Sequence, residues 1–236
     1  KGCGLSADKD SVTMATDRLK IYEKPKFNSP RLLLGFSGWM DGGDVSTGTV
    51  QCLIDKLAAR KLAQIDPEGF YIYSFPGMME LTAMFRPHTR IEDGLIKSYD
   101  VPQALFFASE QEDLILFLGK EPNLNWRDFG ECIFSLCGEF GVKMIYFIGS
   151  VSGLVPHTRE PRLFCAASNS RLKDAFGHYG VNYTNYEGPA SFVTHLAAEC
   201  GQRDLGMISL VAAVPAYVQG TNPKCIEAVV RRLVGM

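Results

Sequence analysis

The chain has 236 residues, of which 46% are hydrophobic and 21% charged, and its formal net charge is -2. This length suits one large α/β domain that buries a core without disulfide or metal support. A nearly neutral chain has no long-range attraction for nucleic acid or an anionic membrane surface, so we expect neither partner.

The cysteines predict the redox environment of the protein. They stand at positions 3, 52, 132, 137, 165, 200 and 225, mostly in apolar stretches, and no two have CxxC spacing. We interpret them as small buried hydrophobic residues in a reducing compartment, and we expect no metal site and no cofactor.

The chain opens with polar residues, and no apolar run approaches the roughly 18 residues of a membrane helix. A cytoplasmic location is therefore expected.

Residues 1–30 are polar and predict an irregular N-terminal arm, with at most a short strand near 19–22. Residues 31–236 read as a single α/β domain. Short apolar runs predict strands at 31–37, 70–75, 104–108, 114–118, 144–148, 162–167 and 206–214. Apolar residues at helical spacing predict helices at 45–60, 128–140, 171–179, 191–200 and 223–234. A polar stretch at 90–101 with an Asp93-Gly94 turn predicts a hairpin at the sheet edge. This alternation predicts a parallel-dominated mixed sheet covered on both faces by helices.

The loop 38–44 follows the first strand of the domain and precedes its helix. It contains Trp39, Asp41, Gly42 and Asp44. Ligands of open α/β sheets bind where parallel strands end, so this position is suggestive. The loop has neither GxGxxG nor a Walker lysine, and its two carboxylates would repel phosphate. The structural alternative is that Asp44 caps the helix and the glycines make the turn.

A second loop, 149–159, follows the predicted strand 144–148. Its central residue in the five-residue window 149–153 is Val151, so it lacks the serine of a GxSxG nucleophile elbow. His157 and Arg159 are candidates for an anion site. The alternative is a hydrogen-bonded loop histidine and a surface arginine.

Glu187 and Tyr217 complete the set of candidate residues. Glu187 precedes the predicted helix 191–200 and would favour its dipole. Tyr217 and Trp39 are candidates for interface aromatics, with filling of the core as the alternative.

Several segments together resemble the proteasome assembly chaperone family, of the second-subunit type. They occur in the family's order and span about 200 residues of the chain: 38–44, 156–161, 186–192, 214–217 and 222–224. The resemblance implies a three-layer αβα fold similar to nucleoside phosphorylases and a homo-oligomer, with a trimer favoured. It also implies a protein partner such as proteasome subunits, since eukaryotic and archaeal relatives assemble or bind proteasome α-rings. Some archaeal relatives dock through a tail of hydrophobic residue, tyrosine and any residue. Leu233-Val234-Gly235-Met236 departs from that pattern, so docking through such a tail is not expected unless the chain extends further.

Two functions therefore remain open. The first is a non-enzymatic, oligomeric binding or assembly protein, which the resemblance and the lack of a complete catalytic constellation favour. The second is a small-molecule enzyme or binder on a phosphorylase-like fold, with Asp41 as acid or base and Arg159 as the anion clamp. Fold similarity supports this second reading by analogy alone.

Overall fold

The computed structural model describes residues 15–177 and 179–235. Its main sheet has nine strands in the order β1-β3-β6-β7-β2-β8-β11-β9-β10. These strands are β1 (Leu19–Ile21), β2 (Arg31–Ser37), β3 (Arg60–Ile65), β6 (Ala104–Ser109), β7 (Leu114–Lys120), β8 (Met144–Gly153), β9 (Leu163–Ala167), β10 (Asn182–Tyr183) and β11 (Gly206–Pro215). The four central strands β7, β2, β8 and β11 are parallel to one another, and β6, β3 and β9 join them with antiparallel pairings.

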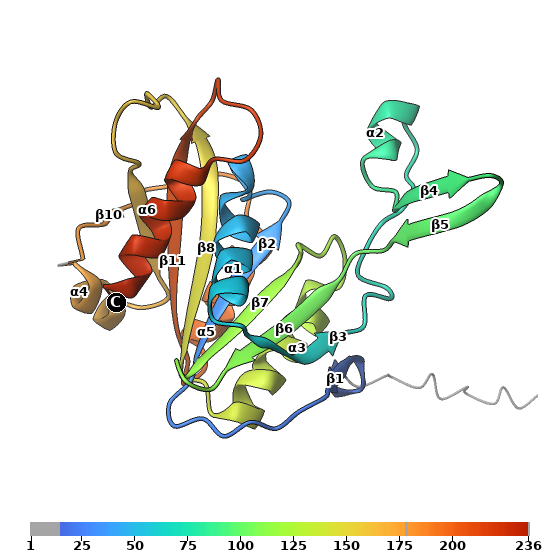
Figure 1. Cartoon of the computed structure of the whole chain (residues 1–236). Coiled ribbons are helices and arrows are strands. Elements are labelled where there is room, and N and C mark those ends of the chain that lie inside the picture. The colour runs from blue at the N-terminus through green and yellow to red at the C-terminus, as the bar shows by residue number, and fades with distance from the viewer. Residues whose placement is uncertain (1–14, 178, 236) are drawn as a thin grey trace, which may run out of the picture.

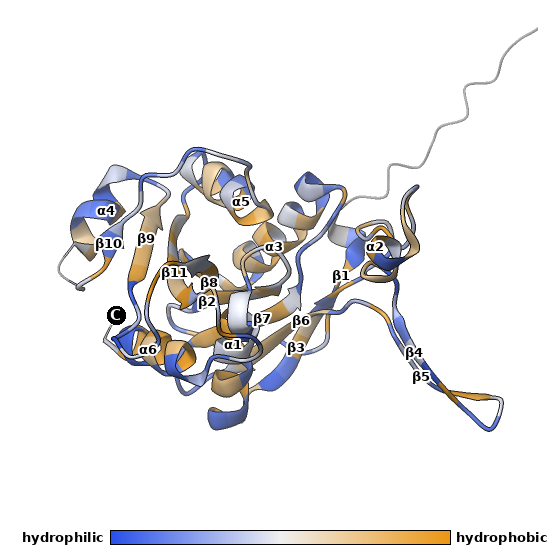
Figure 2. Ribbon diagram, turned by 90° about the horizontal axis from the view of Figure 1, so that it is seen from above, coloured by the Kyte–Doolittle hydropathy of each residue, from blue (hydrophilic) through white to orange (hydrophobic). Residues whose placement is uncertain are grey.

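Helices cover both faces of this sheet (Figures 1 and 2). The α-helices are α1 (Val45–Lys56), α2 (Met79–Ala83), α3 (Trp126–Phe140), α4 (Ser170–Phe176), α5 (Phe192–Gly201) and α6 (Pro223–Val234), with 3-10 turns η1 (Ala15–Arg18) and η2 (Gly42–Asp44). Side chains of β2 alternate between two cores, as the period of a strand requires. Leu32, Leu34 and Phe36 pack with α3 and α5, whereas Leu33 packs with α1, α4 and α6. The predicted three-layer α/β architecture is confirmed.

One predicted element is wrong. The segment 70–75 forms no strand, although Phe70 and Tyr71 are buried in the core. Its backbone bonds to a loop instead, because Phe70 O accepts from the backbone N–H groups of Asn123 and Leu124 at 2.9 and 3.0 Å. The apolar side chains of this segment therefore indicate that it is buried, but they do not indicate that its backbone forms a strand.

The helix predicted over 45–60 ends early. α1 stops at Lys56, and Ala58 has φ 47°, a left-handed conformation that no α-helix continues through. The chain then enters β3, which the sequence pattern did not predict. β1, which comes from the expected N-terminal arm, pairs antiparallel with β3, with Leu19 opposite Ile65 and Ile21 opposite Ala63.

The hairpin predicted at 90–101 is present as β4 (His88–Glu92) and β5 (Leu95–Asp100), which form a separate two-stranded sheet. Together with α2 it stands away from the body of the molecule (Figure 1). Across residues 15–177 and 179–235, no helix has the length and apolarity needed to cross a bilayer.

Candidate functional site

Three loops meet at the carboxyl ends of β2, β8 and β11, where ligands of parallel sheets bind. Backbone bonds hold them together. Met40 O accepts from Ser150 N at 2.9 Å, and Gly43 O accepts from Asn222 N at 2.8 Å. The buried Ser150 hydroxyl also donates to Gly42 O at 2.6 Å. The candidate loop 38–44 is thus fixed between the ends of two other strands.

The Asp41 carboxylate binds the first turn of α1. Its Oδ1 accepts from the backbone N–H groups of Ser46 and Thr47 at 2.8 and 3.1 Å, and its Oδ2 accepts from the Thr47 hydroxyl at 2.7 Å. These are the orphan donors of a helix N-terminus. Burial raises the pKa of Asp41 and outweighs these hydrogen bonds, which favour the charged form. Both carboxylate oxygens are therefore engaged within the chain.

Asp44 and the glycines shape the same turn. Gly43 has φ 64°, and a Cβ there would lie 3.0 Å from the Asn222 Cβ. A side chain at position 42 would also be crowded, because a Cβ there would lie 3.2 Å from Val214 Cγ2. Asp44 makes no side-chain cap bond to α1, and its Oδ2 accepts from the Thr221 hydroxyl at 2.6 Å. In this loop the capping role belongs to Asp41, and Asp44 ties the loop to the segment before α6.

His157 and Tyr217 form a pair across two loops. The Tyr217 hydroxyl accepts from His157 N at 2.8 Å and lies 2.9 Å from its Nδ1. Lys224 Nζ donates to His157 O at 3.1 Å, which ties the pair to α6.

A groove of about 560 Å³ runs beside this pair, between the segment 155–162 and the start of α6. His157, Arg159, Arg162 and Lys224 line it with several apolar residues. Asp41 is not among its lining residues. The structure therefore brings His157, Arg159 and Tyr217 to one region and holds Asp41 in another.

Trp39 and Glu187 lie on the surface. Trp39 is 67% exposed and Tyr217 is 63% exposed, so neither aromatic ring fills the core. Glu187 is also exposed, and Ser191 is the N-cap of α5, accepting from Thr194 N. No group of three or more His, Cys, Asp or Glu side chains within the described residues is arranged to hold a metal ion.

Sequence reasoning missed Glu121, which links the candidate loop to α5. Its Oε1 accepts from Phe192 N at 2.8 Å, and its Oε2 accepts from Trp39 N at 3.2 Å. A carboxylate at a helix N-terminus is favourable both for the dipole and for the free N–H groups. The position of Glu121 could have identified it. It comes one residue after β7 and therefore lies at the same edge of the sheet as the loop 38–44.

With this geometry established, the chain can be placed among known proteins. A model of the PAC2 family matches residues 35–236. The chain belongs to the PAC2 family. The predicted resemblance to proteasome assembly chaperones is thereby confirmed, because solved structures of such homologues have the same fold.

Three solved structures illustrate the relationship. A Mycobacterium tuberculosis proteasome-assembly chaperone homologue is 26% identical, with a TM-score of 0.75 over 87% of this chain and 84% of that one. A PAC2 family protein from Streptomyces avermitilis is 27% identical, with a TM-score of 0.73 over 88% and 85%. The Pyrococcus furiosus archaeal proteasome activator PbaB is 19% identical, with a TM-score of 0.67 over 92% and 86%, and shares the fold. No curated protein matches this chain.

Proposed function

We propose that this PAC2-family chain is a non-enzymatic, homo-oligomeric protein that binds other proteins and assists their assembly. The observation that supports it most is a rim of exposed apolar side chains on the loops after β2, β8 and β11. Trp39, Leu154 and Tyr217 come from these three loops and all are exposed. Exposed aromatic and aliphatic side chains gathered at one edge are typical of surfaces that bind proteins.

The polar groups at the same edge favour binding over catalysis. The Asp41 carboxylate is engaged by α1, and His157 is engaged by Tyr217. A general acid or base needs a free path to a substrate proton, and a nucleophile needs an adjacent base. These residues instead hold three loops in fixed positions beneath the exposed rim.

Affinity capture tests this function. Tagged full-length protein is recovered from lysate of its own host, and the accompanying proteins are identified. We expect near-stoichiometric recovery of subunits of a larger assembly, with proteasome subunits as the first candidates. Recovery of this chain alone would contradict the proposal.

Variants at the rim sharpen the experiment. Trp39→Ser with Leu154→Ser should lower recovery of the partner by about tenfold or more, since central interface side chains contribute on the order of 2 kcal/mol each. The control is Val234→Ser, because Val234 is 83% exposed at the far end of α6, away from the rim. Equal losses in both variants would contradict the assignment of the rim.

The groove beside His157 favours a second candidate, a protein that binds a small anion. Arg159, Arg162 and Lys224 place cationic groups along one concave surface, which the carboxylate of Glu160 also lines. Guanidinium groups recognise carboxylate and phosphate well. A thermal-shift screen with small carboxylates and phosphates tests this candidate, and Arg159→Ala should abolish any shift that the groove produces.

A further inference from the structure

The groove beside His157 combines a buried apolar floor with exposed cations. Three buried residues form the floor: Ala213, Pro215 and Cys225. Three exposed residues carry positive charge along its edge: Arg159, Arg162 and Lys224. The groove volume of about 560 Å³ lies within the range of about 300–1,000 Å³ found for pockets that hold small organic molecules.

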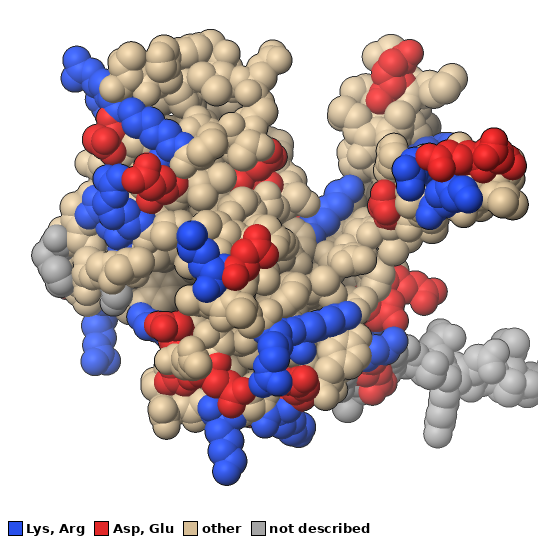
Figure 3. Space-filling view, in the orientation of Figure 1, with Lys and Arg blue, Asp and Glu red and all other residues tan. Residues whose placement is uncertain are grey.

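The charge of this groove is positive. Among the described residues that line it, Glu160 supplies the one carboxylate. Glu160 Oε2 lies 3.9 Å from Arg231 Nη1, so a cation outside the groove partly offsets its charge. Figure 3 shows basic side chains, with acidic ones next to them, at the end of the molecule that holds the loop after β8 and the start of α6. The groove therefore favours an anion.

Asn222 brings a buried amide with an unused donor to this groove. It is the N-cap of α6 and is 9% exposed, and its Oδ1 accepts from Cys225 N at 3.1 Å. That bond fixes which end of the amide faces the helix, so the Nδ2 group is directed away from it. Within residues 15–177 and 179–235 the Nδ2 group has no acceptor. Buried polar groups in native proteins almost always have a hydrogen-bond partner, so this donor needs an acceptor from the groove.

The first turn of α6 supplies a backbone donor beside that amide. Pro223 has no N–H group, and the Cys225 N–H group is used by the cap. The Lys224 N–H group has no partner in the part of the chain that the structure describes. A helix N-terminus carries partial positive charge and favours an anion. Lys224 Nζ also donates to His157 O at 3.1 Å, which holds its ammonium group at the groove.

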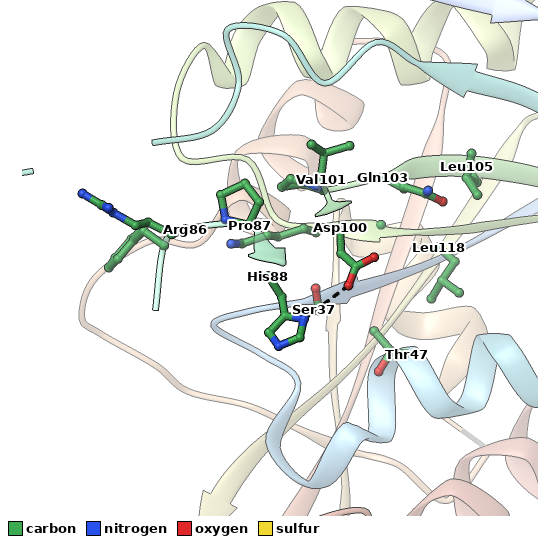
Figure 4. A pocket seen from close by; sticks show the side chains of 14 residues that line it. Ser37, Thr47, Arg86, Pro87, His88, Asp100, Val101, Gln103, Leu105 and Leu118 are labelled. Atoms are coloured by element: carbon green, nitrogen blue, oxygen red, sulfur yellow. Dashed lines mark ion pairs between the residues drawn. The ribbon is translucent and has the colours of Figure 1, made fainter. Parts of the chain in front are cut away.

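The crevice between the β4–β5 hairpin and the body gives a comparison (Figure 4). It measures about 350 Å³ and is lined by the cations Arg86 and Lys120. Asp100 also lines it, with Oδ2 3.5 Å from His88 Nδ1. The first turn of α1 reaches it at Thr47, whose N–H and hydroxyl groups both donate to the carboxylate that caps α1. This crevice therefore has cations, but its donors from the helix are already used.

The apolar floor favours a carboxylate with an apolar body over a bare phosphate ion. A phosphate ion would leave the floor in contact with water, whereas an apolar group would remove both surfaces from water. The Glu160 carboxylate repels a dianion more strongly than a monoanion. A carboxylate also accepts two neighbouring donors in one plane.

We propose that this groove binds a carboxylate that is joined to an apolar group. The carboxylate accepts from Asn222 Nδ2 and the Lys224 N–H group, with Arg159 beside it, and the apolar group lies against Ala213 and Pro215. The inference rests on the second proposed function, the anion binder, and names its ligand class. A free organic acid and the apolar C-terminal residue of a protein both supply this chemistry.

Isothermal titration calorimetry of the full-length chain tests the ligand class. The probes are 4-phenylbutyrate, acetyl-glycyl-phenylalanine, the amide of each, and inorganic phosphate. We expect each carboxylate to bind at least tenfold more tightly than its amide and than phosphate. Tighter binding of the peptide assigns the ligand to a protein chain end, and tighter binding of phenylbutyrate assigns it to a free acid. Equal binding of the amides, or binding of neither carboxylate, overturns the proposal.

The variant Asn222→Asp removes the donor and keeps the cap. Asp and Asn are about equally good N-caps, so the chain should stay folded, which thermal unfolding checks. The new carboxylate faces the ligand, so the affinity for both carboxylates should fall at least tenfold. Asn169→Asp is the matched control, because Asn169 caps α4 in the same way by accepting from Leu172 N at 3.0 Å. Unchanged affinity in Asn222→Asp overturns the proposal.

A second pair of variants tests the position of the ligand. Arg159→Ala should weaken binding of both carboxylates at least tenfold, whereas Arg86→Ala makes the same substitution in the crevice of Figure 4 and should leave it unchanged. Equal losses in the two variants overturn the groove as the site.

The outcomes separate this inference from the proposed functions. If a protein partner is captured through the rim and no carboxylate binds, this inference alone is overturned. If phosphate binds in a manner that depends on Arg159 and no carboxylate does, the small-anion function stands and the ligand class proposed for it is wrong.

Discussion

At the scale of single residues, the carboxylates near the carboxyl edge serve the backbone. Asp41 satisfies N–H groups of α1, and Glu121 satisfies N–H groups of Trp39 and Phe192. Hydrogen bonds from backbone donors to a carboxylate are among the stronger ones in proteins. These residues position the rim without contributing exposed reactive groups.

Removing the Asp41 carboxylate should destabilise the fold. Asp41→Ala leaves the first N–H groups of α1 without their acceptor, so the free energy of unfolding at pH 7 should fall by about 1–2 kcal/mol. Urea denaturation followed by circular dichroism measures it. Asp204→Ala is the control, because the Asp204 side chain is 96% exposed and its ion pair with Lys143 should contribute little. A loss below about 0.5 kcal/mol for Asp41→Ala would contradict the capping role.

The same carboxylate should make stability depend on pH. Burial raises the folded-state pKa of Asp41 above the ordinary 3.8, so the folded state retains the proton longer than the unfolded state. The pH-dependent part of this group's contribution to stability is present at low pH and is lost as pH rises from about that ordinary value through the raised pKa. The hydrogen bonds that Asp41 accepts from α1 remain in the ionised form. The stability of the wild type relative to Asp41→Asn should therefore fall over this window in pH-dependent urea titrations. A relative rise would mean that the hydrogen bonds outweigh burial.

At the scale of elements, close packing of α1 on β2 fixes the start of the site. Gly35 lies on β2, and a Cβ there would meet Val50 Cγ2 at 2.6 Å and Ser46 O at 2.9 Å. The Ser46 hydroxyl, itself buried, accepts from Phe36 N and donates to Ile148 O. α1 therefore sits directly against β2 and is tied to β8.

Gly35→Ala should separate these elements. Overpacking against a backbone carbonyl costs about 1–3 kcal/mol, which thermal unfolding would detect as a lower Tm. Gly138→Ala is the matched control, because a Cβ at that exposed position of α3 meets nothing within 4 Å. That control should be neutral or stabilising by up to about 1 kcal/mol, since alanine favours helix. A neutral Gly35→Ala would contradict the close approach.

The contact between the loop 38–44 and α5 depends on Glu121. Glu121→Gln keeps the shape but removes the charge and one acceptor oxygen, so stability should fall by about 1 kcal/mol in urea denaturation. Glu187→Gln, on an exposed residue before the same helix, should change stability by less than about 0.5 kcal/mol. Equal losses of stability in the two variants would contradict the proposed contribution of the Glu121 carboxylate to the start of α5.

At the scale of the whole molecule, two cores on opposite faces of one sheet provide the stability. Five of the cysteines in the described residues are buried in these cores. Burial raises the pKa of Cys132 and Cys165 to about 11 and that of Cys200 to about 12. A thiol with so high a pKa holds almost no reactive thiolate at neutral pH.

Thiol labelling should therefore report global unfolding. In native buffer at pH 8, Cys132, Cys165 and Cys200 should stay unlabelled for hours, while the half-buried Cys52 should react sooner than these three. Mass mapping of labelled peptides measures each site, and urea should make all of them reactive together. Rapid native labelling of Cys132 or Cys200 would contradict the packing of α3 and α5 against the sheet.

The sequence by itself determined the central strands, the helices that cover them and the family. The strands β2, β8 and β11 are buried on both faces, so each appears in the sequence as a continuous apolar run. The helices α3 and α6 are amphipathic, so their apolar residues recur at helical spacing. Both patterns can be seen in a short stretch of sequence. The residues of the family motifs, such as those of the loop 38–44, are likewise read directly from the chain.

Only the tertiary structure decided which distant groups meet. β3 became a strand because β1 and β6 pair with it, and 70–75 did not because its backbone bonds to 123–124. Glu121 acquired its role from a helix that begins at Phe192, and the hairpin of β4 and β5 became a separate sheet because no other strand of the described residues pairs with it. Each outcome depends on pairings between residues far apart in the chain, and local periodicity carries no record of them.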